Sequence, residues 1–541
     1  MDIHLEWSPE GWVVRYGRRT SQSYTQIPFI SNVETKEDEC VGPALDELGV
    51  PPEERSEALR ELYRQKSKMA EFNPSVWLGK HPEVHDIYMR HESKWVKYDA
   101  VAKRMVFLTA LSAYSDCPLN LFVRAPSSTG KTFVTMQTVK YFPQEDVWLL
   151  GGLSPTAIYH DYGEWHDEND NIMDMRAIDW KDKSNLPDMS KWKYVVDLKN
   201  RILVFLESPH YETYMRLRPI LSHDAYEMRY SFTEKSGRGT MRTKHIYLRG
   251  WPATVFCSVN PQYQEELATR SINITPEMTD KKYEASIQMQ GERASNPWKY
   301  ENPDPMMLLL RTNLRDTSDA MRKFLAVLPY GTELGQCYPH EQPRDMRDFS
   351  KLLSIIQQHT YLHLWQRPWL VEADCEGRRI VLSTMRDFKN AMEVFAYVAE
   401  TTRSGLPGNV LSFFNEVLAA YHDKNEYLTY SDIVDTYRDV YRTSKSRETL
   451  KRSYLNPLME AGWIDEEEST EDRRRKWIRI LHGPEEYLKG FERQFLALFT
   501  PERLDKWMDG VKERHRDAKI LVNGEEQDWD SFAYFYFQEW T

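Results

Sequence analysis

The sequence predicts an α/β protein built around a parallel sheet, with a small β/α region before the sheet and a small domain of helices and a hairpin after it. The first observation behind this prediction is the stretch Leu121 to Thr132, LFVRAPSSTGKT, in which an apolar run ends in a Gly-Lys-Thr turn. The second is Arg201 to Glu207, RILVFLE, an apolar run typical of a strand buried on both faces and ended by a carboxylate. The third is the region 410–481, whose pattern predicts helices followed by two short strands.

Residues 125–132, APSSTGKT, are predicted to form a phosphate-binding loop. Such loops follow the pattern Gly, four residues, Gly-Lys-Ser/Thr, because backbone N–H groups surround the phosphates, Lys reaches the β- and γ-phosphates and the hydroxyl contacts Mg²⁺. Gly130, Lys131 and Thr132 fit the pattern, whereas Ala125 stands where the first glycine is expected. We therefore expect ATP and Mg²⁺ as cofactors, with Thr132 at the metal; the alternative is a chance loop of small residues. The expected nucleotide-binding positions are Ala125, Pro126, Ser127, Ser128, Thr129, Gly130, Lys131 and Thr132.

Composition limits the possible functions. The chain has 541 residues, enough for about two to four domains. Its net charge of −12 argues against a surface that coats nucleic acid as a whole, so any such binding must use local basic patches. Its five cysteines lie far apart, which excludes a zinc ribbon or a disulfide scaffold, and His359 and His363 lack the Glu of a metalloprotease helix. No uncharged apolar run approaches the ~18 residues of a membrane span, so we expect a cytoplasmic protein.

The segments before and just after the loop contain few candidate functional side chains. Residues 3–16 alternate around a Ser-Pro-Glu-Gly turn and predict a hairpin, and residues 36–72 are helical and charged. Residues 98–114 predict a helix that leads into the loop strand, and residues 147–150 predict another strand. Residues 161–195 lack periodicity and are interpreted as an insertion on the surface.

The predicted strand that ends at Glu207 supplies a candidate general base. Parallel strands present polar groups at their carboxyl ends, so we expect Glu207 beside the phosphate loop, where it would activate the attacking water. Leu206 stands where an Asp usually organises Mg²⁺, which would then depend on Thr132, phosphate oxygens and water. The alternative is an apolar strand that ends in Glu by chance.

Two further polar positions follow the next apolar run, TVFCSVN. Asn260 ends that run and could bind the γ-phosphate or orient water. Arg270 follows ten residues later, and an Arg at a subunit edge can reach a neighbour's γ-phosphate and stabilise charge in the transition state.

Residues 226–249 predict a hairpin with an excess of basic side chains. Aromatic residues lie among these cations, a mixture that suits single-stranded nucleic acid, and the alternative is a solvated hairpin. The positions expected to contact nucleic acid are Lys235, Arg238, Arg242 and Lys244.

With loop, acid strand, basic hairpin, Asn260 and Arg270 in this order, the sequence resembles AAA+ ATPases of the pre-sensor-1 hairpin group. More closely, it is similar to MCM-related helicase and helicase-primase proteins of phages and other mobile elements. The resemblance spans roughly residues 98–481 and rests on APSSTGKT, LSPTAIYH, DLKNRILVFLE, LRPILSHDAYEMRY and PRDMRDFSKLLSII with LHLWQR. It implies that the hairpin enters the pore of a ring, that Asn260 is a sensor, and that Arg344 or Arg347 is the sensor-2 arginine of a helical lid. Ala125 and Leu206 depart from the family pattern, and no primase site is recognisable.

The region after the lid predicts a winged helix: helices over 410–421 and 431–441, a third from a Ser446 cap to Ala461, and a hairpin around a charged tip. Its cations fit duplex backbone contact, and the alternative is a winged helix used for protein contact. The positions expected to contact DNA are Arg447, Lys451, Arg452 and Arg474. The tail ends in an aromatic run, DSFAYFYFQEW, interpreted as core or partner surface.

The predicted domains are an N-terminal region (1–95), an AAA+ core (96–335), a helical lid (336–405), a winged helix (406–482) and a helical, aromatic tail (483–541). The leading hypothesis is an ATP-driven DNA translocase or helicase that replicates a mobile element as a homo-oligomeric ring, such as a hexamer. Single-stranded DNA would lie in the pore and duplex at the winged helix. The rival hypothesis is a DNA-bound ATP switch, a transcription, transposition or defence regulator that does not unwind DNA.

Overall fold

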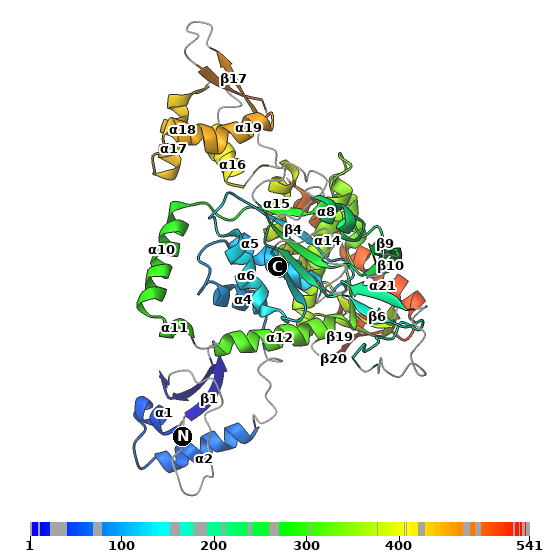
Figure 1. Cartoon of the computed structure of the whole chain (residues 1–541). Helices are drawn as coiled ribbons and strands as arrows, with labels where there is room; N and C mark the ends of the chain where they lie inside the picture. Colours follow the sequence, from blue (N-terminus) through cyan, green and yellow to red (C-terminus); the bar gives the residue numbers. More distant parts are fainter. Residues whose placement is uncertain are drawn as a thin grey trace.

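In the computed structural model of the chain, a central α/β body lies between an N-terminal group of strands and helices and a C-terminal group of helices with a hairpin (Figure 1). Each of the two outer groups has a hydrophobic core of its own. The structure describes residues 3–8, 11–21, 41–68, 78–151, 163–176, 178, 192–207, 211–235, 241–258, 270–301, 304–375, 377–404, 406, 408–419, 428–468, 476–481, 488, 490–522, 525–529, 531–532 and 536. In this part of the chain, no helix is both long and apolar enough to cross a membrane.

The central body contains a five-stranded sheet in which every pairing is parallel. The strands, in spatial order, are β12 (Ile272–Ile274), β4 (Asn120–Arg124), β11 (Ala253–Ser258), β8 (Ile202–Phe205) and β5 (Val147–Leu150). Helices α5 (Ala100–Ser112), α6 (Lys131–Thr138) and α8 (Tyr211–Leu221) connect to these strands. The predicted α/β class with a parallel sheet is therefore confirmed. Strand β11 pairs with both β4 and β8, so one strand separates the acid strand from the loop strand.

A four-stranded sheet carries the predicted hairpin. Its order is β6 (Glu164–His166), β7 (Lys193–Asp197), β10 (Met241–Arg249) and β9 (Glu227–Lys235). Strand β10 pairs with β9 over its whole length but with β7 only at Ile246–Arg249, so the outer half of the ribbon pairs only with itself among the described strands. The interpretation of 161–195 as a surface insertion is wrong at its last residues, because these begin β7 and Tyr194 is buried there in the core that also holds Phe205 and Phe256. These strands are too short for their periodicity to be visible in the sequence.

The lid and the C-terminal tail form one unit around a second five-stranded sheet. Its order is β13 (Phe324–Val327), β15 (Arg378–Leu382), β14 (Trp369–Cys375), β19 (Lys519–Val522) and β20 (Glu525–Gln527). The helices predicted at 349–364 and 385–402 are confirmed as α14 (Asp345–Leu362) and α15 (Met385–Ser404). The lid was predicted to consist of helices. It also contains the second five-stranded sheet, to which the tail contributes β19.

The tail is fastened to the lid by aromatic packing. Phe495 of helix α20 (Phe491–Leu498) has its ring centre 4.6 Å from that of Phe388. The Tyr536 hydroxyl donates to the Ser383 carbonyl at 2.5 Å. Helix α21 (Pro501–Arg514) buries Leu504 and Met508 in the same core. That core also includes Val84 and Ile87 of α4 (Val84–Glu92), so the central body begins before the predicted boundary at residue 95.

The remaining elements complete the three parts of the chain. The N-terminal group consists of β1 (Ile3–Ser8), β2 (Gly11–Tyr16), β3 (Arg19–Thr20), α1 (Val41–Leu48) and α2 (Arg55–Lys68). The central body adds α10 (Asp280–Ser295), α11 (Trp298–Glu301), α12 (Pro305–Met321) and α13 (Gly331–Cys337). The C-terminal group consists of α16 (Gly408–Phe413), β16 (Leu428–Thr429), α17 (Tyr430–Tyr441), α18 (Arg447–Leu450), α19 (Asn456–Glu460), β17 (Ile464–Glu468) and β18 (Lys476–Ile480).

The helices and the hairpin predicted for the C-terminal group are confirmed in order. Ser446 caps α18 by accepting from the Thr449 N–H at 3.3 Å, and a single helical run then continues to Glu460. Gly462 ends that run with φ of +74°, a conformation that favours glycine. The structure adds β16, which pairs with β18 at Leu428 and Ile478.

Candidate nucleotide-binding site

The loop 125–132 connects the carboxyl end of β4 to the amino end of α6, as its sequence predicts. Two residues take positive φ, Ser128 at +65° and Gly130 at +90°. Ala125 is not among the described residues with positive φ, so a methyl group at the first position of the pattern costs no backbone strain. Thr129 closes the turn by donating from its hydroxyl to the Pro126 carbonyl at 2.9 Å. The loop therefore has the curvature of a phosphate-binding turn at the start of a helix.

Lys131 is folded back against the loop. Its Nζ donates to the Ala125 and Pro126 carbonyls, both at 2.7 Å, and its side chain is buried. Burial lowers the pKa of Lys131. Thr132, next in the first turn of α6, is exposed. The ammonium group thus lies within the loop, and the Thr132 hydroxyl is accessible to a ligand at the helix start.

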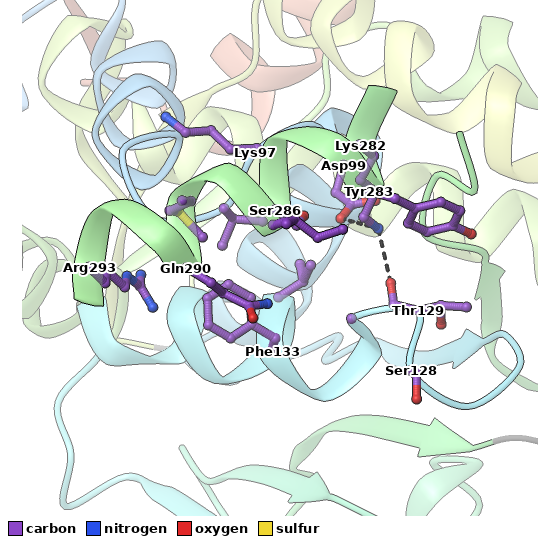
Figure 2. Close-up of a pocket in the computed structure, with 15 residues that line it drawn as sticks. Lys97, Asp99, Ser128, Thr129, Phe133, Lys282, Tyr283, Ser286, Gln290 and Arg293 are labelled. Atoms are coloured by element: carbon purple, nitrogen blue, oxygen red, sulfur yellow. Dashed lines mark hydrogen bonds and ion pairs between the residues drawn. The ribbon is translucent and has the colours of Figure 1, made fainter. Parts of the chain in front are cut away.

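A second lysine, Lys282 of α10, also contacts the loop. Its Nζ donates to the Thr129 carbonyl at 3.0 Å and pairs with the Asp99 carboxylate at 2.6 Å (Figure 2). Asp99 lies just before α5 and accepts from the Glu277 N–H at 2.7 Å. Both side chains are buried, and burial raises the pKa of Asp99 although Lys282 lowers it in part. A buried ion pair therefore links α10, the entry to α5 and the phosphate loop.

A cavity of about 440 Å³ opens beside the loop, between α6 and α10. Figure 2 shows Phe133 and Gln290 near its middle and Lys282 at one end, with Arg293 at the other. The Arg293 guanidinium lies 5.3 Å from the centre of the Tyr300 ring and 5.7 Å from that of Trp95. The volume of the cavity falls in the range of small-molecule sites, and the cavity walls combine apolar side chains with a few polar groups. The walls include Val96, Phe133, Val134, Ser286, Met289 and Gln290.

Glu207 lies at the same edge of the sheet as the loop. Phe205 pairs with Phe256 and Phe256 with Phe122, so Glu207, two residues beyond Phe205, is level with the end of β4. Only β11 lies between, so the backbones are about 10 Å apart across the sheet. Glu207 is exposed, whereas Leu206 packs against the main core. Among the described residues, no three His, Cys, Asp or Glu side chains form a group that could hold a metal ion.

The predicted arginines lie at the opposite edge of the sheet. Arg270 precedes β12, whose Ile272 pairs with Leu121, so Arg270 and the loop are separated by roughly 20 Å along the strands. Arg270 pairs with Asp224 at 3.4 Å. Helix α14 runs along this edge, because Lys351 Nζ donates to the Ser271 carbonyl at 3.1 Å and the Ser354 hydroxyl donates to the Cys117 carbonyl at 2.6 Å.

Arg344 and Arg347 lie at the amino-terminal end of α14. Arg344 donates from Nε to Asp348 at 3.0 Å, and Asp348 also pairs with Lys351 at 2.8 Å. Arg347 is exposed. Helix α14 follows the amino edge of the sheet, whereas the loop follows the carboxyl edge, so both arginines lie away from the loop of their own chain.

The hairpin and the C-terminal group hold the residues expected to contact nucleic acid. Lys235, Arg242 and Lys244 lie in the outer, self-paired half of the ribbon. Arg447 covers the Tyr430 ring at 4.0 Å, and Arg452 is exposed. Lys451 instead forms an ion pair with Glu466 of β17 at 2.9 Å. Hydrogen bonds from Tyr430, Lys451 and Lys476 lower the pKa of Glu466 to about 2. Three predicted positions lie outside the described residues: Arg238, Asn260 and Arg474.

Sequence reasoning missed Lys282, Asp99 and the cavity under α10. Asp99 has φ of +58°, which Asp tolerates better than most residues, but nothing in its neighbourhood signals a contact with α10. The one sequence clue is the basic pair Lys281-Lys282 that begins a helix with an apolar stripe.

Comparisons with known proteins add little. No protein family matches the chain, and no curated protein matches it. A solved structure described as "SCCmec type IV Cch - active helicase" aligns with 90% of this chain and 98% of its own, at 10% sequence identity and a TM-score of 0.29. The assignment of the fold therefore rests on the sheet and the loop of this chain.

Proposed function

We propose that this chain is an ATP-driven DNA translocase or helicase of the AAA+ pre-sensor-1 hairpin group, related to the MCM-type helicases of mobile elements, and that it acts as a homo-oligomeric ring. One observation carries the proposal: the phosphate loop and Glu207 share one edge of the parallel sheet, while Arg270 lies at the other edge. Such a separation suits a site completed by a neighbouring subunit. Head-to-tail contacts that close generate rings.

The residues of the site would divide the chemistry of ATP hydrolysis. Lys131 would leave the loop carbonyls for the β- and γ-phosphates, and the cavity between α6 and α10 would take the nucleoside. Glu207 would accept a proton from the attacking water. Thr132, with phosphate oxygens, would hold Mg²⁺, which would neutralise charge at the phosphates. Arg270 of the next subunit would stabilise the charge that develops on the γ-phosphate.

The hairpin and the C-terminal group would contact DNA. The outer half of the β9–β10 ribbon is free of β7 and carries Lys235, Arg242 and Lys244, which suits a single strand in a ring pore. The helices α17 to α19 with the β17–β18 hairpin suit a winged helix on duplex DNA. Arg447 and Arg452 remain candidates there, while Lys451 is better explained as a support of the hairpin.

A second function deserves a test, because Leu206 replaces the carboxylate that usually organises the metal and packs into the core instead. A DNA-bound ATP switch needs slow hydrolysis and no unwinding. It would use the same loop, lid and DNA-binding surfaces.

The experiment is ATP hydrolysis by the purified full chain, alone, with single-stranded DNA and with duplex, together with strand displacement on a forked substrate. Lys131→Ala is the blank. The helicase proposal expects stimulation by single strands and unwinding, both lost when Arg242 and Lys244 are changed to Ala. Duplex-dependent or negligible turnover with intact forks would instead favour the switch.

A further inference from the structure

Near its carboxyl end, helix α10 carries an arginine surrounded by aromatic rings. The Arg293 guanidinium lies 5.3 to 5.8 Å from the centres of three rings, those of Trp95, Phe133 and Tyr300. The rings of Trp95 and Tyr300 also contact each other, with their centres 5.5 Å apart. The buried Nε of Arg293 has no hydrogen-bond partner among the described residues. The rings therefore position this guanidinium by cation–π contact, without a carboxylate to neutralise its charge.

Three further cations gather at this end of α10. Figure 2 shows Lys97 and Arg293 at the end of the cavity that lies away from Thr129. Lys140, just after α6, accepts a hydrogen bond at its carbonyl from Arg311 Nε of α12 at 2.6 Å. Partial burial, Arg311 and Arg293 all lower the pKa of Lys140. Because neighbouring positive charges disfavour a protonated lysine, Arg293 and Arg311 must both lie close to the Lys140 ammonium group.

The described part of the chain supplies no carboxylate partner to these cations, which are Lys97, Lys140, Arg293 and Arg311. Two other lysines in the same region are paired, Lys94 with Asp304 at 3.6 Å and Lys299 with Glu292 at 3.3 Å. Since the chain as a whole carries a net charge of −12, this local excess of positive charge favours an anionic ligand.

An exposed tryptophan indicates which anion suits the cations. Trp298 of α11 is 63% exposed and is followed by Lys299 and Tyr300. Residues 94–98, KWVKY, also alternate lysines with aromatic residues, and the two stretches meet where Trp95 contacts Tyr300. In single-strand sites, cations follow the phosphates and rings stack on the bases. A free phosphate has no base to stack, and the bases of a duplex are already stacked on one another.

We propose that a single strand of nucleic acid lies across the ends of α6 and α10 beside α11, with its phosphates at the four cations and a base stacked on Trp298. We call this surface the α10 patch; it consists of Lys97, Lys140, Arg293, Arg311 and Trp298. The contact is separate from the β9–β10 ribbon and from the C-terminal group, and it does not require a ring.

Binding of a fluorescently labelled oligothymidylate to the full chain, followed by anisotropy, tests the stacking contact. Trp298→Ala should raise the dissociation constant about 10-fold, the scale of one lost base–aromatic stack. Trp298→Phe keeps a ring at this position and should retain most of the affinity. Loss of affinity in Trp298→Ala that Trp298→Phe does not restore would show that the ring does not stack on a base.

The dependence of binding on salt tests the phosphate contacts. Lys140→Gln removes one cation of the α10 patch that does not line the cavity. The slope of the logarithm of the association constant against the logarithm of salt concentration should become shallower by ~0.7, the share of one phosphate on a single strand. Lys506→Gln, which changes an exposed lysine of α21, is the matched control and should leave the slope unchanged.

The outcomes separate this inference from the proposed function. If Trp298→Ala and Lys140→Gln bind the strand as the wild-type chain does, while Arg242→Ala with Lys244→Ala abolishes binding, the α10 patch is overturned and the ribbon contact stands. If inorganic tripolyphosphate displaces the labelled strand as well as unlabelled strand does at equal phosphate concentration, the surface is a general anion site and the inference is wrong. If the wild-type chain binds no single strand, both the α10 patch and the translocase proposal fail.

Discussion

The cationic side chains at the carboxyl edge of the parallel sheet have different partners from those at its amino edge. At the carboxyl edge, Lys131 and Lys282 are held by loop carbonyls and by Asp99. At the amino edge, Arg270 and Arg344 each have a carboxylate partner, yet the buried Arg270 Nε and Arg344 Nη2 have no hydrogen-bond partner among the described residues. Buried donors without partners are costly and call for an explanation. The two lysines at the carboxyl edge are thus held within their own chain, whereas Arg270 and Arg344 at the amino edge each keep one donor without a partner among the described residues.

The largest expected effect is at the amino edge. Arg270→Ala should lower kcat for ATP hydrolysis by about 10³-fold, the scale of an arginine that stabilises the transition state. Affinity for ATP should stay unchanged, because Arg270 lies far from the loop of its own chain. Phosphate release and equilibrium binding of a fluorescent ATP analogue measure the two effects. A parallel loss of affinity would mean that Arg270 acts within its own subunit.

Lys131→Ala should affect both quantities at the carboxyl edge. We expect at least about a 100-fold loss of turnover, since one preorganised cation is removed from the phosphates. ATP affinity should fall as well, because Lys131 contacts the ground-state phosphates. Thr129→Ser, which retains the hydroxyl bound to Pro126, is the matched control and should keep most activity. Unchanged ATP binding in Lys131→Ala would contradict the assignment of the loop.

The Lys282–Asp99 pair should be important for stability. Lys282→Met leaves the Asp99 carboxylate, 1% exposed, without its cation, and removing one partner of a buried pair costs about 3 kcal/mol or more. Chemical denaturation of the full chain, followed in the central body by tryptophan fluorescence, measures this loss. The double variant Asp99→Asn with Lys282→Met should recover part of it. Equal losses in the single and double variants would show that the pair carries no such energy.

Acid should weaken the amino edge through helix α14. Burial, with a contribution from His363, lowers the pKa of His359 to about 3, and burial together with Arg367 lowers that of His363 to about 4. Both histidines stay neutral in the folded protein while the unfolded chain takes up protons below about pH 6.5. Stability is therefore retained above pH 6.5 and lost as the pH falls toward 4, by about 1.4 kcal/mol per pH unit for each histidine.

A pair of variants tests how much His363 contributes to this dependence of stability on pH. His363→Asn should flatten the dependence of unfolding free energy on pH by the share of one histidine, whereas the exposed His340 changed to Asn should not. An unchanged slope in His363→Asn would show that His363 is protonated in the folded state.

The sequence could predict those features whose pattern lies within one short stretch of the chain. The loop between β4 and α6, the strand before Glu207 and the hairpin are each contained in a short stretch, so loop chemistry and strand alternation sufficed to predict their local structure. The place of β11 between β4 and β8 could not be predicted, because spatial strand order is not written in any one segment. The lid sheet was missed because β19 comes from the tail, far along the chain from its partner β14. Lys282 was missed for the same reason, since its contact with Asp99 depends on how α10 crosses the loop.

The most direct test of the two-edge account mixes defective subunits. Arg270→Ala chains retain Glu207, and Glu207→Gln chains retain Arg270, so each kind is inactive alone for a different reason. The account predicts that a mixture regains ATP hydrolysis, because some interfaces pair an intact loop edge with an intact amino edge. If no ratio of the two chains restores turnover while both still assemble and bind ATP, Arg270 does not complete the neighbouring site, and the central claim is wrong.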